Sequence, residues 1–353
     1  MDLAQLSRYL PKLEDRLRAS YAVAAQTAPK SLLTYLDVNR DFTLRGGKRF
    51  RATLVLAGYY LATGRDPKPV VDAAAAVEHF QSWMLIHDDI IDHAEQRRGG
   101  VAVHRALAAA HRREGLGGSS DDYGVGIGIT LGDLEEPFTV EAILSVKVPA
   151  PARLAALAEY VRMTRMTAYG QLLDIRNGTL APGAVTEADV LDVHRLKSAV
   201  YTVASPLAIG ALLGGARPTS LKDLESIALD LGIAFQLRDD VLGAGFDATE
   251  SGKSANDLIE GKRTLLVVRA WQTGKDADRE ALHRVLGCPE ASPSEVAAAR
   301  ETIRSTGSLD YSEERIRQLT ERALARLRRS RSIRSEAKPL LVELADRLTR
   351  RRA

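Results

Sequence analysis

Three aspartates stand close together in the stretch WMLIHDDIIDHAEQRRG, residues 83–99. Asp88 and Asp92 are four residues apart, so a helix would carry both on one face, and Asp89 directly follows Asp88. Carboxylates this close repel one another unless a cation lies between them, and oxygen-only ligands favour a hard divalent ion. We therefore expect Mg²⁺, bound through these carboxylates together with substrate phosphates. A solvated acidic helix end is the alternative, but the apolar neighbours argue against it.

Basic residues and a second acidic pair complete this chemistry. Arg97 and Arg98 follow the first aspartates, and guanidinium groups match the geometry of phosphate oxygens. Asp239 and Asp240 form another doublet in the apolar stretch FQLRDDVLG, far along the chain. Two such doublets predict two walls of one cavity that holds metal-bound phosphate.

Two further stretches contain basic residues that could bind an anion. Residues 45–51, RGGKRFR, pair two glycines with four bases just before an apolar segment, and helix N-termini bind anions. An ordinary basic helix start explains this stretch equally well. Lys197 lies four residues before Tyr201 in an otherwise apolar segment, so it needs an anionic partner or a route to water. Gln171 and Asp174, three residues apart, are either a surface pair or support for a metal site.

The elements that position these residues are predicted to be helices. Aromatic residues make up 5% of the 353-residue chain, and no run of alternating β-branched residues recurs. One or two amphipathic helices are expected within residues 1–36, and Asp121 and Asp122, among glycines and serines, are expected in a loop. The uncharged segment 199–216 is predicted to be a buried core helix rather than a membrane span. Further helices are predicted over 52–62, 70–91, 125–147, 151–178 and from 190 onward.

Composition excludes several classes of protein. The 49 basic and 46 acidic residues nearly balance, which predicts no nucleic-acid partner, and the basic tail at Arg350, Arg351 and Arg352 is expected to be solvated. The single cysteine, Cys288, excludes an internal disulfide framework and fits a reducing cytosol. A charged N-terminus without an apolar core predicts no secretory signal. Three apparent motifs fail on spacing or context: a calcium loop at Asp37, Asn39 and Asp41, a dinucleotide loop at Gly124, Gly126 and Gly128, and a phosphate loop at Gly252, Lys253 and Ser254.

Taken together and in order, the motifs resemble those of the trans-isoprenyl diphosphate synthases, the polyprenyl synthetase family, from about residue 40 to the end. The resemblance implies an all-α isoprenoid synthase fold, with helices around a deep central apolar cavity in a single domain spanning 1–353, and a cytoplasmic homodimer. The matching segments are GGKxxR at 46–51, DDxxD at 88–92 followed by RRG, GQxxD at 170–174, Lys197, FQxxDD at 235–240, and the GK...D...GK segment at 252–262.

The resemblance also implies a reaction and a set of roles. The protein would be a Mg²⁺-dependent prenyltransferase that condenses isopentenyl diphosphate with an allylic diphosphate, using three ions. Asp88 and Asp92, with Asp89, would hold two ions, and Asp239, with Asp240, the third. Contacts to the allylic diphosphate are implied for Arg97, Lys197 and Lys253, and contacts to isopentenyl diphosphate for Lys48, Arg51, Gln81 and Arg98. Gln236 and Lys262 are also expected to bind substrate.

Two departures from the family pattern and one clue to product length stand out. Gly243 replaces the last aspartate of the second motif, where Asp247 offers only partial compensation, and Gln81 stands where many members have histidine. Trp83 and Met84 precede Asp88 by five and four residues, positions that cap the growing tail in this family. Because only the fifth position is aromatic and methionine yields space, geranylgeranyl diphosphate is favoured over farnesyl diphosphate. Trp83 as an ordinary core residue is the alternative.

Two rival functions are weighed against this prediction. A terpene cyclase shares the fold but takes no second diphosphate, so the cations Lys48, Arg51 and Arg98 argue against it. A non-catalytic subunit of a heteromeric synthase typically loses one aspartate motif, and this chain has both doublets. Mg²⁺-dependent turnover by the purified protein alone would separate these possibilities.

Overall fold

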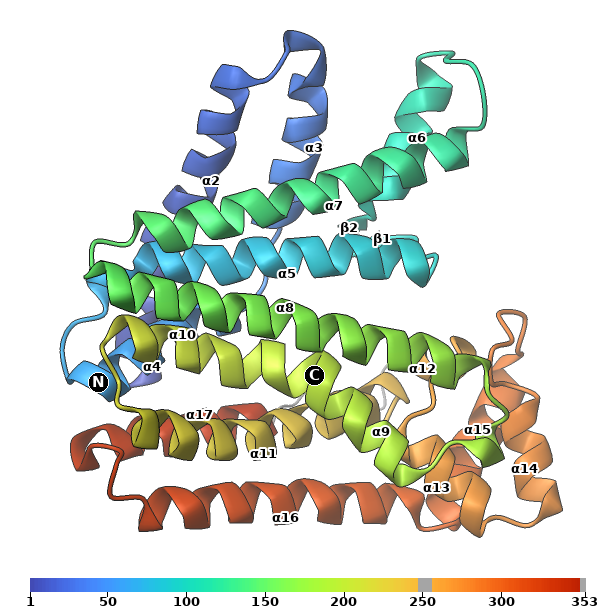
Figure 1. The fold of residues 1–353 in the computed structure, drawn as a ribbon. Helices are drawn as coiled ribbons and strands as arrows, with labels where there is room; N and C mark the ends of the chain where they lie inside the picture. The colour runs from blue at the N-terminus through green and yellow to red at the C-terminus, as the bar shows by residue number, and fades with distance from the viewer. Residues whose placement is uncertain (247–255, 350–353) are drawn as a thin grey trace. The chain divides into compact units, whose positions relative to one another are not determined.

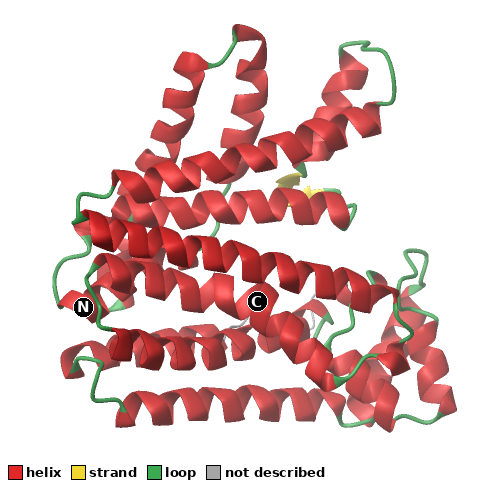
Figure 2. Cartoon of the chain, viewed as in Figure 1, coloured by secondary structure: helices red, strands yellow, loops and turns green. Residues whose placement is uncertain are grey.

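The computed structural model of the protein describes residues 1–246 and 256–349. The described chain is helical apart from one antiparallel hairpin, in which β1 (Gln96–Arg97) pairs with β2 (Gly100–Val101) (Figures 1 and 2). The all-α fold is therefore confirmed. Several residues named above lie outside the described part of the chain: Asp247, Gly252, Lys253, Ser254 and the tail at Arg350, Arg351 and Arg352.

The chain divides into two compact units, and the first comprises residues 1–158 and 206–216. The predicted N-terminal apolar stripe is buried here, through Leu6, Leu13 and Leu17. In this unit α5 runs along α7 (Figure 1). Its elements are α1 (Leu3–Ser7), α2 (Leu10–Thr27), η1 (Lys30–Leu32), α3 (Leu33–Leu44), α4 (Phe50–Thr63), η2 (Lys68–Val70), α5 (Val71–Ile91), α6 (Val103–Arg113), α7 (Ser120–Ser145), the start of α8 (Ala150–Thr179) and most of α10 (Ser205–Leu213).

The second unit comprises residues 159–205 and 217–353. Its central helix α11 packs against both η4 and α16, and Leu237 and Val241 of α11 belong to a core shared with α13. Its further elements are η3 (Pro182–Ala184), α9 (Glu187–Val193), η4 (His194–Ala204), α11 (Pro218–Gly243), α12 (Asn256–Ile259), α13 (Leu265–Thr273), α14 (Asp276–His283), α15 (Pro293–Ser305), α16 (Ser308–Arg329), η5 (Ser335–Ala337) and α17 (Lys338–Thr349). The single domain and the central cavity stay predictions.

Most predicted helices are confirmed within a few residues, and two expectations need correction. Asp121 and Asp122 lie in the first turn of α7 rather than in a loop, because Ser119 caps that helix and acidic residues favour its positive end. The N-terminal prediction was too short, since α3 runs from Leu33 to Leu44. Asn39 lies within α3 and donates to the Leu131 carbonyl, consistent with the rejection of a calcium loop.

The uncharged segment 199–216 falls within η4 and α10. Among the described residues, one helical stretch, Glu187–Leu213, is long and apolar enough to cross a membrane, and 67% of its most apolar window is buried. Burial of this kind is what a core helix shows, and it agrees with the predicted core role.

Candidate active site

The first aspartate motif lies at the C-terminal end of α5. The helix ends at Ile91, and the backbone N–H of Asp92 still donates to the carbonyl of Asp88, at 2.8 Å. This i to i+4 hydrogen bond places both residues on one turn, so their predicted common face is confirmed. Both residues are half-buried, so their carboxylates are within reach of a ligand.

Asp89 has a different environment, because its side chain is 1% exposed and faces Arg97. The Nε of Arg97 donates to Oδ1 of Asp89 at 2.6 Å, and Nη2 of Arg97 lies 3.7 Å from Oδ2 of Asp88. Burial raises the pKa of the Asp89 carboxyl, although the Arg97 charge opposes the rise. For Arg97, burial acts to lower the pKa, but the neighbouring aspartates outweigh it and raise the value. Asp89 therefore orients Arg97 beside the face of α5 that carries Asp88 and Asp92.

The arginine pair is positioned by the hairpin that follows α5. Arg98 and Gly99 form its two-residue turn with φ of 54° and 71°, the double left-handed geometry of a tight hairpin. Glycine adopts this conformation without strain, and arginine does so here at some cost. The turn sends Arg97 to Asp89 and places the Arg98 guanidinium 5.8 Å from the Phe42 ring centroid.

Three residues predicted to bind the second diphosphate come together. With its amide oxygen turned toward the arginines, Gln81 accepts from Nη1 of Arg51 at 2.9 Å and from Nη2 of Arg98 at 3.3 Å. Gln81 comes from α5, Arg51 from the first turn of α4 and Arg98 from the hairpin. Lys48, the fourth predicted member, is exposed in the loop before α4. A cationic cluster thus adjoins the helix that carries Asp88.

Arg49 is a structural residue that sequence reasoning missed. Its φ of 46° turns the backbone inward just before α4, and its buried Nη1 lies 3.1 Å from Oε2 of Glu78. Oε1 of Glu78 accepts from the backbone N–H of Ala52 at 3.3 Å, which caps α4. This ion pair fixes the loop between Lys48 and Arg51. A lone glutamate in the alanine-rich start of α5 was the signal that could have revealed it.

Trp83 and Met84 lie on different faces of α5. The Trp83 indole meets the rings of Phe80 and His87 edge-on, at centroid distances of 5.9 and 6.2 Å. A Cβ at Gly132 of α7 would lie 3.4 Å from Trp83, so the indole packs against that helix. Met84 lies four residues before Asp88 and therefore on the same face of α5. Trp83 is thus firmly held, as both a cavity floor and a core residue would be.

In the second aspartate doublet, as in the first, the two acids differ in burial. Asp239 is half-buried, whereas Asp240 is 5% exposed and both its oxygens are approached by neighbours. Gln236 donates to Oδ1 of Asp240 at 2.9 Å, and Nε2 of His194 lies 3.0 Å from its Oδ2. His194 was not predicted, because it lies on η4 and no spacing rule links it to α11. Each doublet therefore combines one half-buried acid and one buried acid.

Lys197 lies on η4, whose π-helical turns are common at functional sites. Its Nζ lies 2.6 Å from Oδ2 of Asp174, so of the two predicted alternatives, an anionic partner or a route to water, the structure shows an anionic partner. A Cβ at Gly170 of α8 would lie 2.2 Å from the backbone nitrogen of Lys197, closer than any real contact. In the GQxxD segment, Gly170 therefore allows the backbone of η4 to pack closely against α8, and Asp174 forms the ion pair with Lys197.

Gly243 leaves room for a carboxylate from elsewhere in the second unit. A Cβ at Gly243 would lie 1.9 Å from Oδ2 of Asp257, so Asp257 fills the space of the missing side chain. Nζ of Lys262 lies 3.1 Å from the other oxygen of Asp257. Burial raises the pKa of the Asp257 carboxyl, against the Lys262 charge, and the Asp240 charge adds to the rise. Asp257 thus supplies an acid close to the position that the motif lacks.

The donor chemistry fits Mg²⁺. Within the described residues, no group of three or more His, Cys, Asp or Glu side chains forms a metal cage. Mg²⁺ in proteins usually binds through one or two carboxylates and completes its shell with water and substrate phosphates. The one-turn pair of Asp88 and Asp92 and the half-buried Asp239 are carboxylates of that kind.

The chain matches known proteins along most of its length. The polyprenyl synthetase family model matches residues 34–303. A geranylfarnesyl diphosphate synthase of Natronomonas pharaonis is 31% identical, over 96% of this chain and 96% of that protein. A geranylgeranyl diphosphate synthase of Methanosarcina mazei is 35% identical, over 75% of this chain and 74% of that protein. The crystal structure of a geranylgeranyl pyrophosphate synthase from Corynebacterium glutamicum, complexed with isoprenyl diphosphate and magnesium, has a TM-score of 0.91 and 34% identity, covering 100% of both chains.

The chain therefore belongs to the polyprenyl synthetase family. Its class of activity is that of a prenyltransferase. The family resemblance drawn from the ordered motifs is confirmed, and the residue roles that it implied stay predictions.

Proposed function

We propose that the protein is a short-chain isoprenyl diphosphate synthase, which joins isopentenyl diphosphate to an allylic diphosphate and makes geranylgeranyl diphosphate. The observation that carries this proposal is the cluster of Gln81, Arg51 and Arg98 beside the helix of Asp88. A second cationic cluster next to the proposed metal-binding face suits an enzyme with two diphosphate substrates. A cyclase, which ionises one diphosphate, has no use for it.

The proposed metal ligands are Asp88 and Asp92 on α5 and Asp239 on α11, with three Mg²⁺ in the complete site. Bound Mg²⁺ would supply positive charge that stabilises the departing diphosphate. Asp89 and Asp240, also predicted as ligands, are engaged by Arg97 and by Gln236. We therefore assign them the orientation of those neighbours, since an outer partner holds a ligand set in place. Asp257 is proposed to take the role of the last aspartate of the second motif, which Gly243 replaces in this chain.

The chain's own residues would carry out the remaining steps. Arg97 and Lys197, with Lys253 and Lys262, would hold the allylic diphosphate as its C–O bond breaks, and fixed cations favour the charge that develops on the leaving group. The isopentenyl double bond then attacks the allylic carbocation, and the released diphosphate accepts the proton lost from the new product. Gln81, Arg51, Arg98 and Lys48 would hold the intact isopentenyl diphosphate in position for that attack.

The product length is proposed from Trp83 and Met84, with farnesyl diphosphate as the alternative. Similar proteins named above make geranylgeranyl and geranylfarnesyl diphosphates by name, which supports a product of at least twenty carbons. The test is to incubate the purified protein with Mg²⁺, isopentenyl diphosphate and each allylic primer, and to measure product length by mass spectrometry. A twenty-carbon product is expected, and fifteen carbons would establish the alternative. No product from any primer would contradict the proposed function.

We also propose a cytoplasmic homodimer, as the family resemblance implies. Light scattering during size-exclusion chromatography should give twice the 38.4 kDa mass of the chain. A monomer that turns over at full rate would contradict the assembly and leave the proposed reaction intact.

A further inference from the structure

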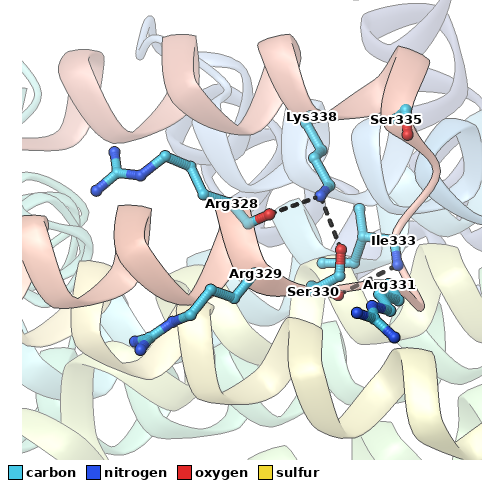
Figure 3. Close-up of a pocket in the computed structure, with 7 residues that line it drawn as sticks. All are labelled: Arg328, Arg329, Ser330, Arg331, Ile333, Ser335 and Lys338. Carbon is cyan, nitrogen blue, oxygen red and sulfur yellow. Dashed lines mark hydrogen bonds between the residues drawn. The ribbon is translucent and has the colours of Figure 1, made fainter.

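The turn between α16 and α17 is strongly basic. Residues 326–338 contain six basic side chains and one acid, Glu336. Two cations are neutralised within the second unit, because Arg326 pairs with Asp230 and Arg334 with Glu336. The ammonium of Lys338 donates to the carbonyls of Arg328 and Ser330, at 3.2 and 2.7 Å (Figure 3).

Three arginines of this turn keep an uncompensated charge. Arg328, Arg329 and Arg331 are exposed, and none has a carboxylate within ion-pair distance in the part of the chain that the structure describes. We call these three residues the arginine triplet. Arg328 and Arg329 also suit the negative end of α16 in its last turn, but Arg331 lies beyond the helix and gains little there.

The backbone that carries the triplet is held to α11. The hydroxyls of Ser330 and Ser332 both donate to Oδ2 of Asp223, each at 2.6 Å, and these bonds lower the pKa of that carboxyl. Ser220 donates to the carbonyl of Ser332 at 3.0 Å, and Ile333 is buried. The charges are therefore presented on a fixed turn, and little backbone entropy is lost when they bind a partner.

Two hollows border this turn and share Arg329, Ser330 and Arg331. One has a volume of about 840 Å³ and extends to Lys338, and the other, of about 390 Å³, extends to Arg326. Figure 3 shows the side chains of Arg328 and Arg329 extending along one side of the turn and Arg331 on the other. The guanidinium groups do not converge on one ion, so they suit several separate phosphates.

We propose that the arginine triplet docks the protein on an anionic phospholipid surface. Such a surface offers many phosphates in one plane, which spaced arginines can contact together. A nucleic acid fits less well, because residues 326–338 contain no aromatic side chain for stacking and the whole chain has a net charge of only +3. The biological purpose rests on the proposed function: the apolar twenty-carbon chain of the product partitions into lipid, where a reaction that transfers its prenyl group would consume it.

The test uses the full-length protein and sedimentation with vesicles of phosphatidylcholine alone or mixed with phosphatidylglycerol, without substrate. We expect binding only to the mixed vesicles, weakening as salt screens the charges. Each arginine near an anionic surface should contribute about fivefold, so the triple variant R328Q/R329Q/R331Q should lose roughly a hundredfold in partitioning. The corresponding triple lysine variant should bind about as well as the wild type.

A matched control removes three ion-paired arginines of the same unit, in the variant R279Q/R284Q/R317Q. Arg279 pairs with Asp276, Arg284 with Glu280, and Arg317 with both Glu314 and Glu321. Three arginines are removed in each triple variant, so the net charge changes equally while the control keeps the triplet intact. We expect this control to bind within about twofold of the wild type. If both triple variants lose binding equally, net charge rather than the triplet drives docking, and the proposal fails.

Other outcomes also decide the proposal. Equal binding of the wild type to both vesicle types, or full binding by R328Q/R329Q/R331Q, would overturn it, as would tight binding to a short DNA duplex without binding to vesicles. Displacement by millimolar pyrophosphate at constant ionic strength would indicate a soluble phosphate as ligand instead. If the triple variant does not fold, Arg331→Gln alone should still show the single-residue loss. Turnover in vesicle-free solution should be unchanged in the folded variants, which separates this proposal from the proposed function.

Discussion

At the scale of single residues, the neighbours of each charged group indicate its role. Asp88 and Asp89 are adjacent in sequence, yet Arg97 engages Asp89 at 2.6 Å while Asp88 lies 3.7 Å from the same guanidinium. The pattern of a doublet predicted two similar ligands. It could not separate them, because the distinction depends on the hairpin that returns Arg97 to α5. Residue type and spacing predict the kind of chemistry, and tertiary contacts give the two members of a doublet different surroundings.

The cationic cluster of Arg51, Gln81 and Arg98 yields the first prediction. Arg51→Ala should raise the KM for isopentenyl diphosphate by about tenfold or more with little change in the KM for the allylic substrate, because we propose that Arg51 and its partner Gln81 bind the substrate that is not ionised. Initial rates with each substrate varied in turn provide the measurement. Arg40→Ala is the control, since this exposed arginine pairs with Asp37 on α3. A selective rise in the allylic KM would reverse the assignment of the two pockets.

The second prediction concerns Trp83. Replacing it with alanine should lengthen the product by one or more isoprene units, because the indole held between Phe80 and His87 would no longer limit the tail. Product length is measured by mass spectrometry, and circular dichroism verifies that the variant is folded. Phe80→Leu is a packing control on the same helix, from which we expect the wild-type product. An unchanged distribution from a stable, active Trp83→Ala variant would identify Trp83 as a core residue.

At the scale of elements, the sequence predicts helices well where one helix face decides burial. The extent of α5 followed from its apolar spacing and its terminal aspartates. The π-helical turns of η4 did not, because a shift from i+4 to i+5 hydrogen bonding has no local signature and depends on packing against α8 and α11. The left-handed Arg49 was likewise missed, since its conformation is stabilised by Glu78 on a different helix.

The close approach of α8 to η4 gives the third prediction. Gly170→Ala should lower Tm by several degrees and reduce turnover, because a methyl group would lie 2.2 Å from the Lys197 nitrogen and overpacking costs about 1–3 kcal/mol. Gly178→Ala on the same helix is the matched control, since nothing lies within 4 Å of its added Cβ. It should leave Tm unchanged or slightly higher. Equal effects of the two substitutions would show that helix propensity, not the approach of η4, governs the response.

The fourth prediction concerns Asp257, whose carboxylate occupies the space that a side chain at position 243 would fill. Asp257→Ala should weaken Mg²⁺-dependent activity by about ten- to a hundredfold, as loss of a supporting metal-site residue does. Gly243→Asp alone should destabilise the protein, because its side chain would collide with Asp257. The double variant should regain Tm and part of the lost apparent Mg²⁺ affinity. Thermal denaturation and Mg²⁺ titration of the rate test this, and a double variant no better than the worse single variant would contradict it.

At the scale of the whole molecule, each aspartate doublet belongs to its own compact unit, Asp88 to the first and Asp239 to the second. The repetition of an acidic doublet predicted that two parts of the chain serve one reaction. Division into units could not be predicted from composition, since both units are built from similar helices.

The fifth prediction tests whether the two doublets share a ligand. Mg²⁺ with inorganic pyrophosphate at about a hundredfold its Kd should stabilise the wild type by about 2.7 kcal/mol, which is several degrees in Tm, and a chelator should abolish the shift. If one ligand needs both doublets, Asp88→Ala and Asp239→Ala should each remove most of the shift, and the double variant should lose no more than either. Asp37→Ala, at an exposed acid of the first unit, should keep the full shift. Partial losses that add in the double variant would mean that each unit binds metal and diphosphate independently, and the shared site would be rejected.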